Sequence, residues 1–160
     1  RVVLIACSAS KADGPGPYPP RELYTGSMFR AALAYAESAK VPWAVLSAKY
    51  GLLLPSRSVA PYEQKLTRKE GPEWAAGIVR QLDDLGLLVA GTGLSAPTWE
   101  IHAGALYADP LVELLRGTRT RPAHGRRVGG WRSPESVREP LRGLQIGQRL
   151  AWYAARKGEP

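Results

Sequence analysis

The stretch Val45-Leu46-Ser47-Ala48-Lys49-Tyr50-Gly51-Leu52-Leu53-Leu54-Pro55 joins a buried type of strand to an abruptly polar segment. Residues 43–46 are apolar, as in a strand that is covered on both faces of a sheet. A serine, a lysine and a tyrosine follow directly. In open α/β sheets, ligands bind outside the carboxyl ends of the strands. The stretch therefore predicts an α/β fold with a ligand site at this point of the chain.

A second strand of the same kind lies upstream. Residues 2–6 are a continuous apolar run that ends in the small and polar residues Cys7-Ser8-Ala9-Ser10-Lys11. Residues 13–20 hold four prolines and two glycines and predict an irregular loop. Residues 27 to about 40 predict a helix that Ser27 caps, with the buried face Phe29, Ala32, Leu33 and Ala36. A strand, a helix and a strand in this order predict a parallel pair, with both polar ends on one edge of the sheet.

The middle of the chain continues this alternation. Thr67 and Glu70 form a capping-box pattern ahead of a predicted helix, whose buried stripe is Trp74, Ile78 and Leu82. Residues 85–93 predict a loop or a short strand. Residues 99–104 predict a third strand, with Glu100 and His102 on one face because side chains alternate along a strand.

Two further helices are expected towards the end of the chain. Asp109 and Pro110 predict the start of one helix, which Gly117 ends. Residues 144–156 predict a final amphipathic helix. The whole pattern predicts one domain over residues 1–160, a three-layer, Rossmann-like α/β fold in which helices flank a mostly parallel sheet.

The charge of the chain is strongly positive. It has 22 Lys and Arg against 14 Asp and Glu, a formal net charge of +8 and a pI near 9.9. Such a surplus favours polyanions, either nucleic acid or an anionic surface. Eight arginines gather in residues 116–142, which predict a basic loop. Its candidate nucleic-acid-binding residues are Arg119, Arg121, Arg126, Arg127, Trp131 and Arg132, and the alternative is a disordered solubilising loop.

The remaining composition excludes several classes of protein. A single cysteine, Cys7, excludes an internal disulfide framework and fits a reducing compartment, so a cytoplasmic location is expected. No apolar run approaches the roughly 18 residues of a membrane span, and the opening residues 1–5 are too short for a signal-peptide core. Without a CxxC pair, and with two histidines, neither a metal nor a cofactor is expected.

Polar residues from the first two loops are predicted to meet at the carboxyl edge of the sheet. After the first strand, backbone N–H groups and Lys11 could bind an anion, and the alternative is a half-buried Cys7 thiol in a tight turn. After the second strand, Lys49 could hold a phosphate and Tyr50 could stack on a base, while Gly51 permits close approach of a ligand. The alternative is a surface lysine beside a core tyrosine.

Two more groups of residues are candidates for the site. Arg21 and Tyr24, just before the first helix, could reach the mouth of the sheet, and the alternative is a solvated Arg21–Glu22 pair beside a packing tyrosine. Glu100 and His102 could supply an acid and a base, and the alternative is a histidine that is merely hydrogen-bonded.

Several motifs in order resemble a known family. They are Cys7 to Lys11, Glu22 to Thr25, Ser47 to Leu53, Pro61-Tyr62, His102 to Tyr107, and Gly143 to Gln148. Together they resemble the YaaA family of bacterial peroxide-stress proteins, and more closely a group of small YaaA-related domains. The Cys-x-x-x-Lys motif is also similar to the catalytic module of archaeosine synthases. The resemblance implies a compact α/β domain that acts on or near nucleic acid, DNA more than RNA.

The leading hypothesis is an enzyme that acts on a modified or damaged base of a nucleic acid, as a DNA glycosylase or a nucleobase transferase. Its candidate catalytic residues are Cys7, Lys11, Lys49, Glu100 and His102. Its candidate substrate-binding residues are Ser8, Arg21, Glu22, Tyr24, Ser47, Tyr50, Gly51, Tyr62 and Tyr107. The alternatives are a non-catalytic stress-protection protein that binds DNA or a nucleotide, and an enzyme of free nucleotides or nucleosides.

Overall fold

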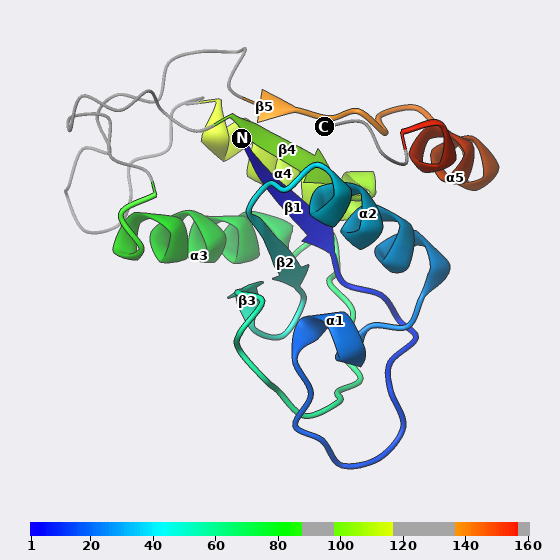
Figure 1. Ribbon diagram of the computed structural model, residues 1–160. Coiled ribbons are helices and arrows are strands. Elements are labelled where there is room, and N and C mark those ends of the chain that lie inside the picture. The colour runs from blue at the N-terminus through cyan, green and yellow to red at the C-terminus, as the bar shows by residue number, and fades with distance from the viewer. Residues whose placement is uncertain (88–97, 117–136, 157–160) are drawn as a thin grey trace, which may run out of the picture.

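A five-stranded sheet in the order β3-β2-β1-β4-β5 runs through the part of the protein that the structure describes. Its strands are β1 (Val2–Ala6), β2 (Trp43–Ser47), β3 (Gly51–Leu53), β4 (Trp99–His102) and β5 (Val137–Arg138). The β1–β2, β1–β4 and β4–β5 pairs are parallel, and β3 is antiparallel to β2. The computed structural model describes residues 1–87, 98–116 and 137–156 (Figure 1). The prediction of an α/β protein with a mostly parallel sheet is confirmed.

Helices cover both faces of this sheet (Figure 1). They are α1 (Pro20–Leu23), α2 (Ser27–Ser38), α3 (Gly71–Asp84), α4 (Ala105–Leu115) and α5 (Ile146–Ala155). The alternation of side chains along β1 explains the two layers. Val3 and Ile5 pack in one buried cluster with α2 and α5, whereas Leu4 packs with α3 and α4 on the other face. The one-turn helix α1 lies beyond the carboxyl ends of β1 and β2.

The first two strands have the predicted bounds, and their register positions the site. Ala6 pairs with Leu46, and the Cys7 backbone N–H donates to the Leu46 carbonyl at 3.0 Å. Cys7 and Ser47, the next residues of the two strands, therefore lie side by side at one edge. The sequence did not predict β3, which folds back on β2 through a turn at residues 48–50.

The predicted starts of α4 and α2 differ from the structure. The predicted start of α4 at Asp109 is wrong, because backbone N–H groups of Tyr107 and Ala108 already bond to the Gly104 carbonyl. Pro110 lies inside α4, where its missing N–H leaves the carbonyl four residues earlier without its usual helical bond. In α2, Gly26 is the capping residue and Ser27 is the first helical residue.

The reciprocal bonds expected between Thr67 and Glu70 do form. The carboxylate of Glu70 accepts from the Thr67 backbone N–H at 2.9 Å, and the Thr67 hydroxyl lies 3.4 Å from the Glu70 backbone N–H. These bonds close a turn immediately ahead of α3, so the helix itself begins at Gly71.

The far end of the predicted basic loop is packed, contrary to its prediction as a loop. Val137 and Leu141 are buried, and Arg142 forms ion pairs with Asp109 and Glu139. Two apolar side chains among many polar ones are enough to attach this segment to both cores. The predicted nucleic-acid-binding residues Arg119, Arg121, Arg126, Arg127, Trp131 and Arg132 lie outside the described residues, as do Gly117 and most of residues 85–93.

Among the described residues, no helix has the length and apolar character needed to cross a membrane.

Candidate functional site at the carboxyl edge

A chain of three hydroxyl groups lies where β1 and β2 end. The Tyr62 hydroxyl lies 2.7 Å from the Ser47 hydroxyl and 2.9 Å from the Tyr24 hydroxyl. All three side chains are buried. The loop before α1 and the loop after β3 bring them together, since Lys11 bridges to Tyr24 and Tyr18 bridges to Val59.

Ser47 also builds the turn that carries the lysine. Its hydroxyl oxygen accepts hydrogen bonds from the backbone N–H groups of Lys49 at 3.2 Å and Tyr50 at 3.0 Å. Serine at the end of a strand suits this role, because a short hydroxyl can bond to the backbone two or three residues further on. The sequence change from apolar strand to Ser47 therefore fixes both the turn and the hydroxyl chain.

Cys7 and Tyr107 extend the site towards α4. The Cys7 sulfur lies 3.6 Å from the Tyr107 hydroxyl. The Tyr107 ring meets the Trp74 ring edge to face, with 5.3 Å between the ring centres. We call Cys7, Tyr24, Ser47, Tyr62 and Tyr107 the carboxyl-edge cluster.

Two lysines lie over this cluster. The ammonium of Lys11 is 4.5 Å from the centre of the Tyr62 ring, and that of Lys49 is 5.8 Å from the same ring and 5.2 Å from the Tyr50 ring. Cations are attracted to the faces of aromatic rings at such distances. Lys11 also donates to the Ala9 carbonyl at 3.3 Å. Two positive charges thus converge on one tyrosine from separate loops.

The phenols of the cluster are held in their neutral form. Burial raises the pKa of Tyr24 to about 12, and it also raises the pKa of Tyr62 and Tyr107. The charge that Cys7 carries as a thiolate would raise the pKa of all three further. At neutral pH these groups remain O–H donors. Within the described residues no carboxylate hydrogen-bonds to the cluster, so its chemistry complements an anion.

Other predicted binding residues lie at the margins of this site. Ser8 accepts a hydrogen bond from the Gly26 backbone N–H at 3.2 Å and holds the start of α2. Arg21 forms an ion pair with Glu37 of α2, and Glu22 is exposed on α1. Gly51 has a positive φ of 70° at the start of β3. Of these, only Gly51 adjoins the turn that bears Lys49.

The structure places Glu100 and His102 in a different cluster. Their side chains share one face of β4, as predicted, with 2.8 Å between His102 Nε2 and a Glu100 oxygen. His102 Nδ1 lies 2.6 Å from the Tyr153 hydroxyl of α5, and Glu100 lies 3.8 Å from Arg1. Both side chains are buried under α2 and α5. Their polar partners are not those of the carboxyl-edge cluster.

The charge state of Glu100 follows from these partners. Burial opposes its ionisation, but hydrogen bonds from His102 and Tyr35, with the nearby charges of His102 and Arg1, outweigh burial and lower its pKa. The ionised carboxylate is a structural anion within the protein interior. His102, hydrogen-bonded to both Glu100 and Tyr153, matches the alternative of a hydrogen-bonded strand histidine, whereas Glu100 also lines a separate cavity of about 250 Å³.

Sequence reasoning missed two residues beside the site. The Trp74 indole N–H donates to the Ser47 carbonyl at 2.8 Å, yet its place on the apolar stripe of α3 indicated only core packing. The Gln81 amide oxygen accepts from the Leu52 backbone N–H at 2.7 Å, and its nitrogen donates to the Tyr50 carbonyl at 3.3 Å. Without β3, no sequence signal could reveal that role.

Residues 2–155 match a protein family that is described as a family of unknown function, DUF6884. The chain belongs to this family. No match was found among curated proteins or among solved structures. The DUF6884 match covers all the elements described above, including every residue of the carboxyl-edge cluster. The resemblance to YaaA proteins and to archaeosine synthases stays a prediction.

Proposed function

We propose that this protein is a nucleic-acid-processing enzyme that binds its substrate at the carboxyl edge of a three-layer, Rossmann-like domain. The substrate is a modified or damaged base within a nucleic acid, which is DNA rather than RNA. The reaction is that of an N-glycosylase or a nucleobase transferase. One observation carries the proposal: the ammonium groups of Lys11 and Lys49 converge on Tyr62, above a set of buried O–H donors.

This arrangement supports a ligand that joins an anion to an aromatic ring. The two ammonium groups suit a phosphate, because lysine acts as a compact point charge with three donors. The Tyr50 ring, partly exposed beside Lys49, can stack on a base that neighbours the substrate base in the polymer. A net charge of +8 favours a polyanion that carries such units.

The proposed chemistry uses Cys7. Its thiol first gives its proton to water, and the thiolate then attacks the sugar carbon of the glycosidic bond, so that the electron pair of the carbon–nitrogen bond leaves with the base. A lysine ammonium donates a proton to the departing base. The resulting amine takes a proton from the water that displaces the sulfur as a thiolate; in a transferase, a second base displaces it instead. Tyr107, at 3.6 Å, holds the sulfur by its hydroxyl.

This proposal is tested with a panel of oligonucleotides, each of which carries one modified base. Mass spectrometry measures the free base that the protein releases from them. The wild type should produce free base, and Lys49→Ala and Cys7→Ala should each lower the rate at least tenfold. Lys69→Ala, which removes an exposed lysine, is the matched control and should react normally. Full activity in both the Lys49→Ala and the Cys7→Ala variants would contradict the proposed chemistry.

A second candidate is a non-catalytic module that binds DNA or a nucleotide. The absence of a hydrogen-bonded carboxylate from the cluster, within the described residues, favours it, because hydrolysis of a glycosidic bond commonly uses a positioned carboxylate. Binding without product from any tested base would support this second function. A cytoplasmic location stays a prediction from the single cysteine.

A further inference from the structure

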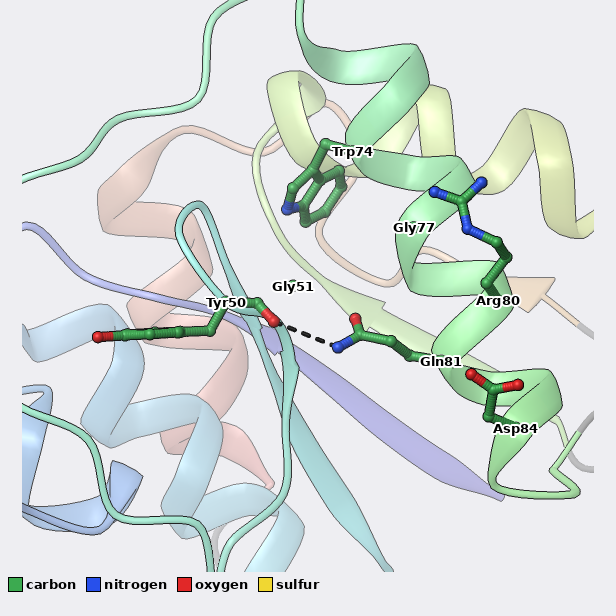
Figure 2. Close-up of a pocket in the computed structure, with 7 residues that line it drawn as sticks. All are labelled: Tyr50, Gly51, Trp74, Gly77, Arg80, Gln81 and Asp84. Atoms are coloured by element: carbon green, nitrogen blue, oxygen red, sulfur yellow. Dashed lines mark hydrogen bonds between the residues drawn. The ribbon is translucent and has the colours of Figure 1, made fainter.

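A groove of about 420 Å³ lies between β3 and α3, next to the carboxyl-edge cluster (Figure 2). Its volume falls within the usual range of small-molecule sites, roughly 300–1,000 Å³. The residues that line it are Tyr50, Gly51, Trp74, Gly77, Arg80, Gln81 and Asp84. Apart from Tyr50 and Gly51, none of these residues takes part in the site proposed above.

Glycine opens this groove from the side of the helix. Gly77 lies inside α3, where glycine is less favourable than alanine. A Cβ at this position would have only the guanidinium of Arg80 nearby, at 3.8 Å, so packing does not require glycine here. The bare backbone at Gly77 instead leaves room for a flat group against α3.

The walls of the groove are held rigidly. The Trp74 indole is fixed by its bond to the Ser47 carbonyl and by the Tyr107 ring. The Gln81 amide is fixed at both ends by β3 and the turn before it. Figure 2 shows that the Tyr50 carbonyl faces Gln81 while the Tyr50 ring points away from the groove. Tyr50 therefore separates the groove from the Lys49 side of the site.

The rim carries one donor group and one acceptor group with no assigned partner. In the described ranges, no side-chain hydrogen bond or ion pair joins the Arg80 guanidinium or the Asp84 carboxylate to another residue. A guanidinium only donates and a carboxylate only accepts. A ligand that satisfies both must present acceptors and donors along one edge. Nucleobases combine such an edge with a flat ring that can contact an indole.

We propose that this groove is the base subsite of the protein and takes the ring of a nucleobase beside Trp74 and Gly77. The inference rests on the proposed function, because the phosphate of the same nucleotide would lie at Lys11 and Lys49 on the other side of Tyr50. The backbone of one residue, Tyr50, borders both halves, so a single nucleotide can occupy them together.

Calorimetric titration with separate halves of a nucleotide tests this inference. The probes are the four common 2′-deoxynucleosides, 2-deoxyribose 5-phosphate and the four deoxynucleoside 5′-monophosphates. Gly77→Leu should weaken binding of the best nucleoside at least tenfold and leave binding of the sugar phosphate unchanged. The double variant Lys11→Met/Lys49→Met should weaken binding of the sugar phosphate at least tenfold and leave binding of the nucleoside unchanged. Gly147→Leu, at a helical glycine with open space around it in α5, is the matched control and should change neither.

The outcomes separate the groove from the lysine site. If the wild type does not bind 2-deoxyribose 5-phosphate but Gly77→Leu still weakens nucleoside binding, the phosphate site at the lysines is contradicted and the base subsite in the groove is supported. Nucleosides that fail to bind the wild type, or bind Gly77→Leu equally well, would overturn the inference. If Gly77→Leu fails to fold, the double variant Arg80→Ala/Asp84→Asn replaces it, because both positions are exposed. This double variant should also weaken nucleoside binding.

Discussion

The indole N–H of Trp74 donates a hydrogen bond of 2.8 Å to the backbone carbonyl of Ser47. This bond joins α3 to the end of β2, and the hydroxyl of the same serine belongs to the carboxyl-edge cluster. Ser47 therefore contacts both the groove, through Trp74, and the cluster beneath Lys11 and Lys49, through Tyr62.

Ser47→Ala should lower the free energy of unfolding by about 1–3 kcal/mol, because it removes one of the two hydroxyl partners of the buried Tyr62 and leaves two turn N–H groups without their acceptor. Urea unfolding measures this change. Ser38→Ala, at an exposed serine that bonds to the Tyr35 carbonyl, should cost no more than about 0.5 kcal/mol. Equal costs for the two variants would mean that Ser47 does not organise the turn.

Gly51→Ala should destabilise the protein more than Gly86→Ala. Both glycines have positive φ, 70° and 66°, so each alanine pays about 1–2 kcal/mol for its backbone. The new Cβ at Gly51 would also lie 2.3 Å from the Gln81 amide oxygen, whereas Gly86 has open space. This overlap should add at least about 1 kcal/mol.

A double-mutant cycle isolates that overlap. In a Gln81→Ala background, Gly51→Ala should cost only as much as Gly86→Ala, because the obstructing amide is gone. An unchanged cost in that background would show that Gln81 does not confine Gly51. Thermal or urea unfolding of the four variants is sufficient.

Glu100 should make stability depend on acid pH. Its pKa in the folded protein is lowered from 4.5, so the unfolded chain binds the proton more tightly. The stabilisation is therefore present above about pH 4.5 and is lost as the pH falls through the lower, folded pKa. Glu100→Gln should flatten this part of the stability profile and also lower stability at pH 7. Glu22→Gln, at an exposed carboxylate, should leave the profile unchanged, and a profile equally steep in Glu100→Gln would contradict the assignment.

Gly77→Ala should raise the free energy of unfolding by about 0.5–1 kcal/mol, because alanine is favoured in a helix interior and its methyl group has room here. Guanidinium unfolding measures this gain. A loss of stability would show that the helix needs glycine at this position for its own packing, and the open groove would then be incidental.

The sequence predicted β1, β2 and β4 of the described sheet but neither β3 nor β5. The apolar runs gave the bounds of β1 and β2 directly, and the crossover between them placed Cys7 beside Ser47. Side-chain alternation correctly paired Glu100 with His102 on one face. It could not show that this face is covered by α5, since Tyr153 comes from a segment 51 residues away.

Local patterns failed where tertiary contacts decide. Pro110 indicated a helix start, but the packing of α4 against α3 and the sheet tolerates it inside the helix. The short strand β3 has no alternating pattern of its own and is held by Gln81 from α3. The side chains of Trp74 and Gln81 therefore became visible as part of a site only in three dimensions.

The salt dependence of binding to a short single-stranded oligonucleotide tests the central claim most directly, that Lys11 and Lys49 together bind the phosphates of a nucleic acid. The slope of log K against log salt should be shallower by about 1.4 in Lys11→Met/Lys49→Met than in the wild type, about 0.7 for each lost phosphate contact. Lys40→Met/Lys69→Met, which removes two exposed lysines, should keep the wild-type slope. Equal slopes for the wild type and the Lys11/Lys49 variant would contradict the account.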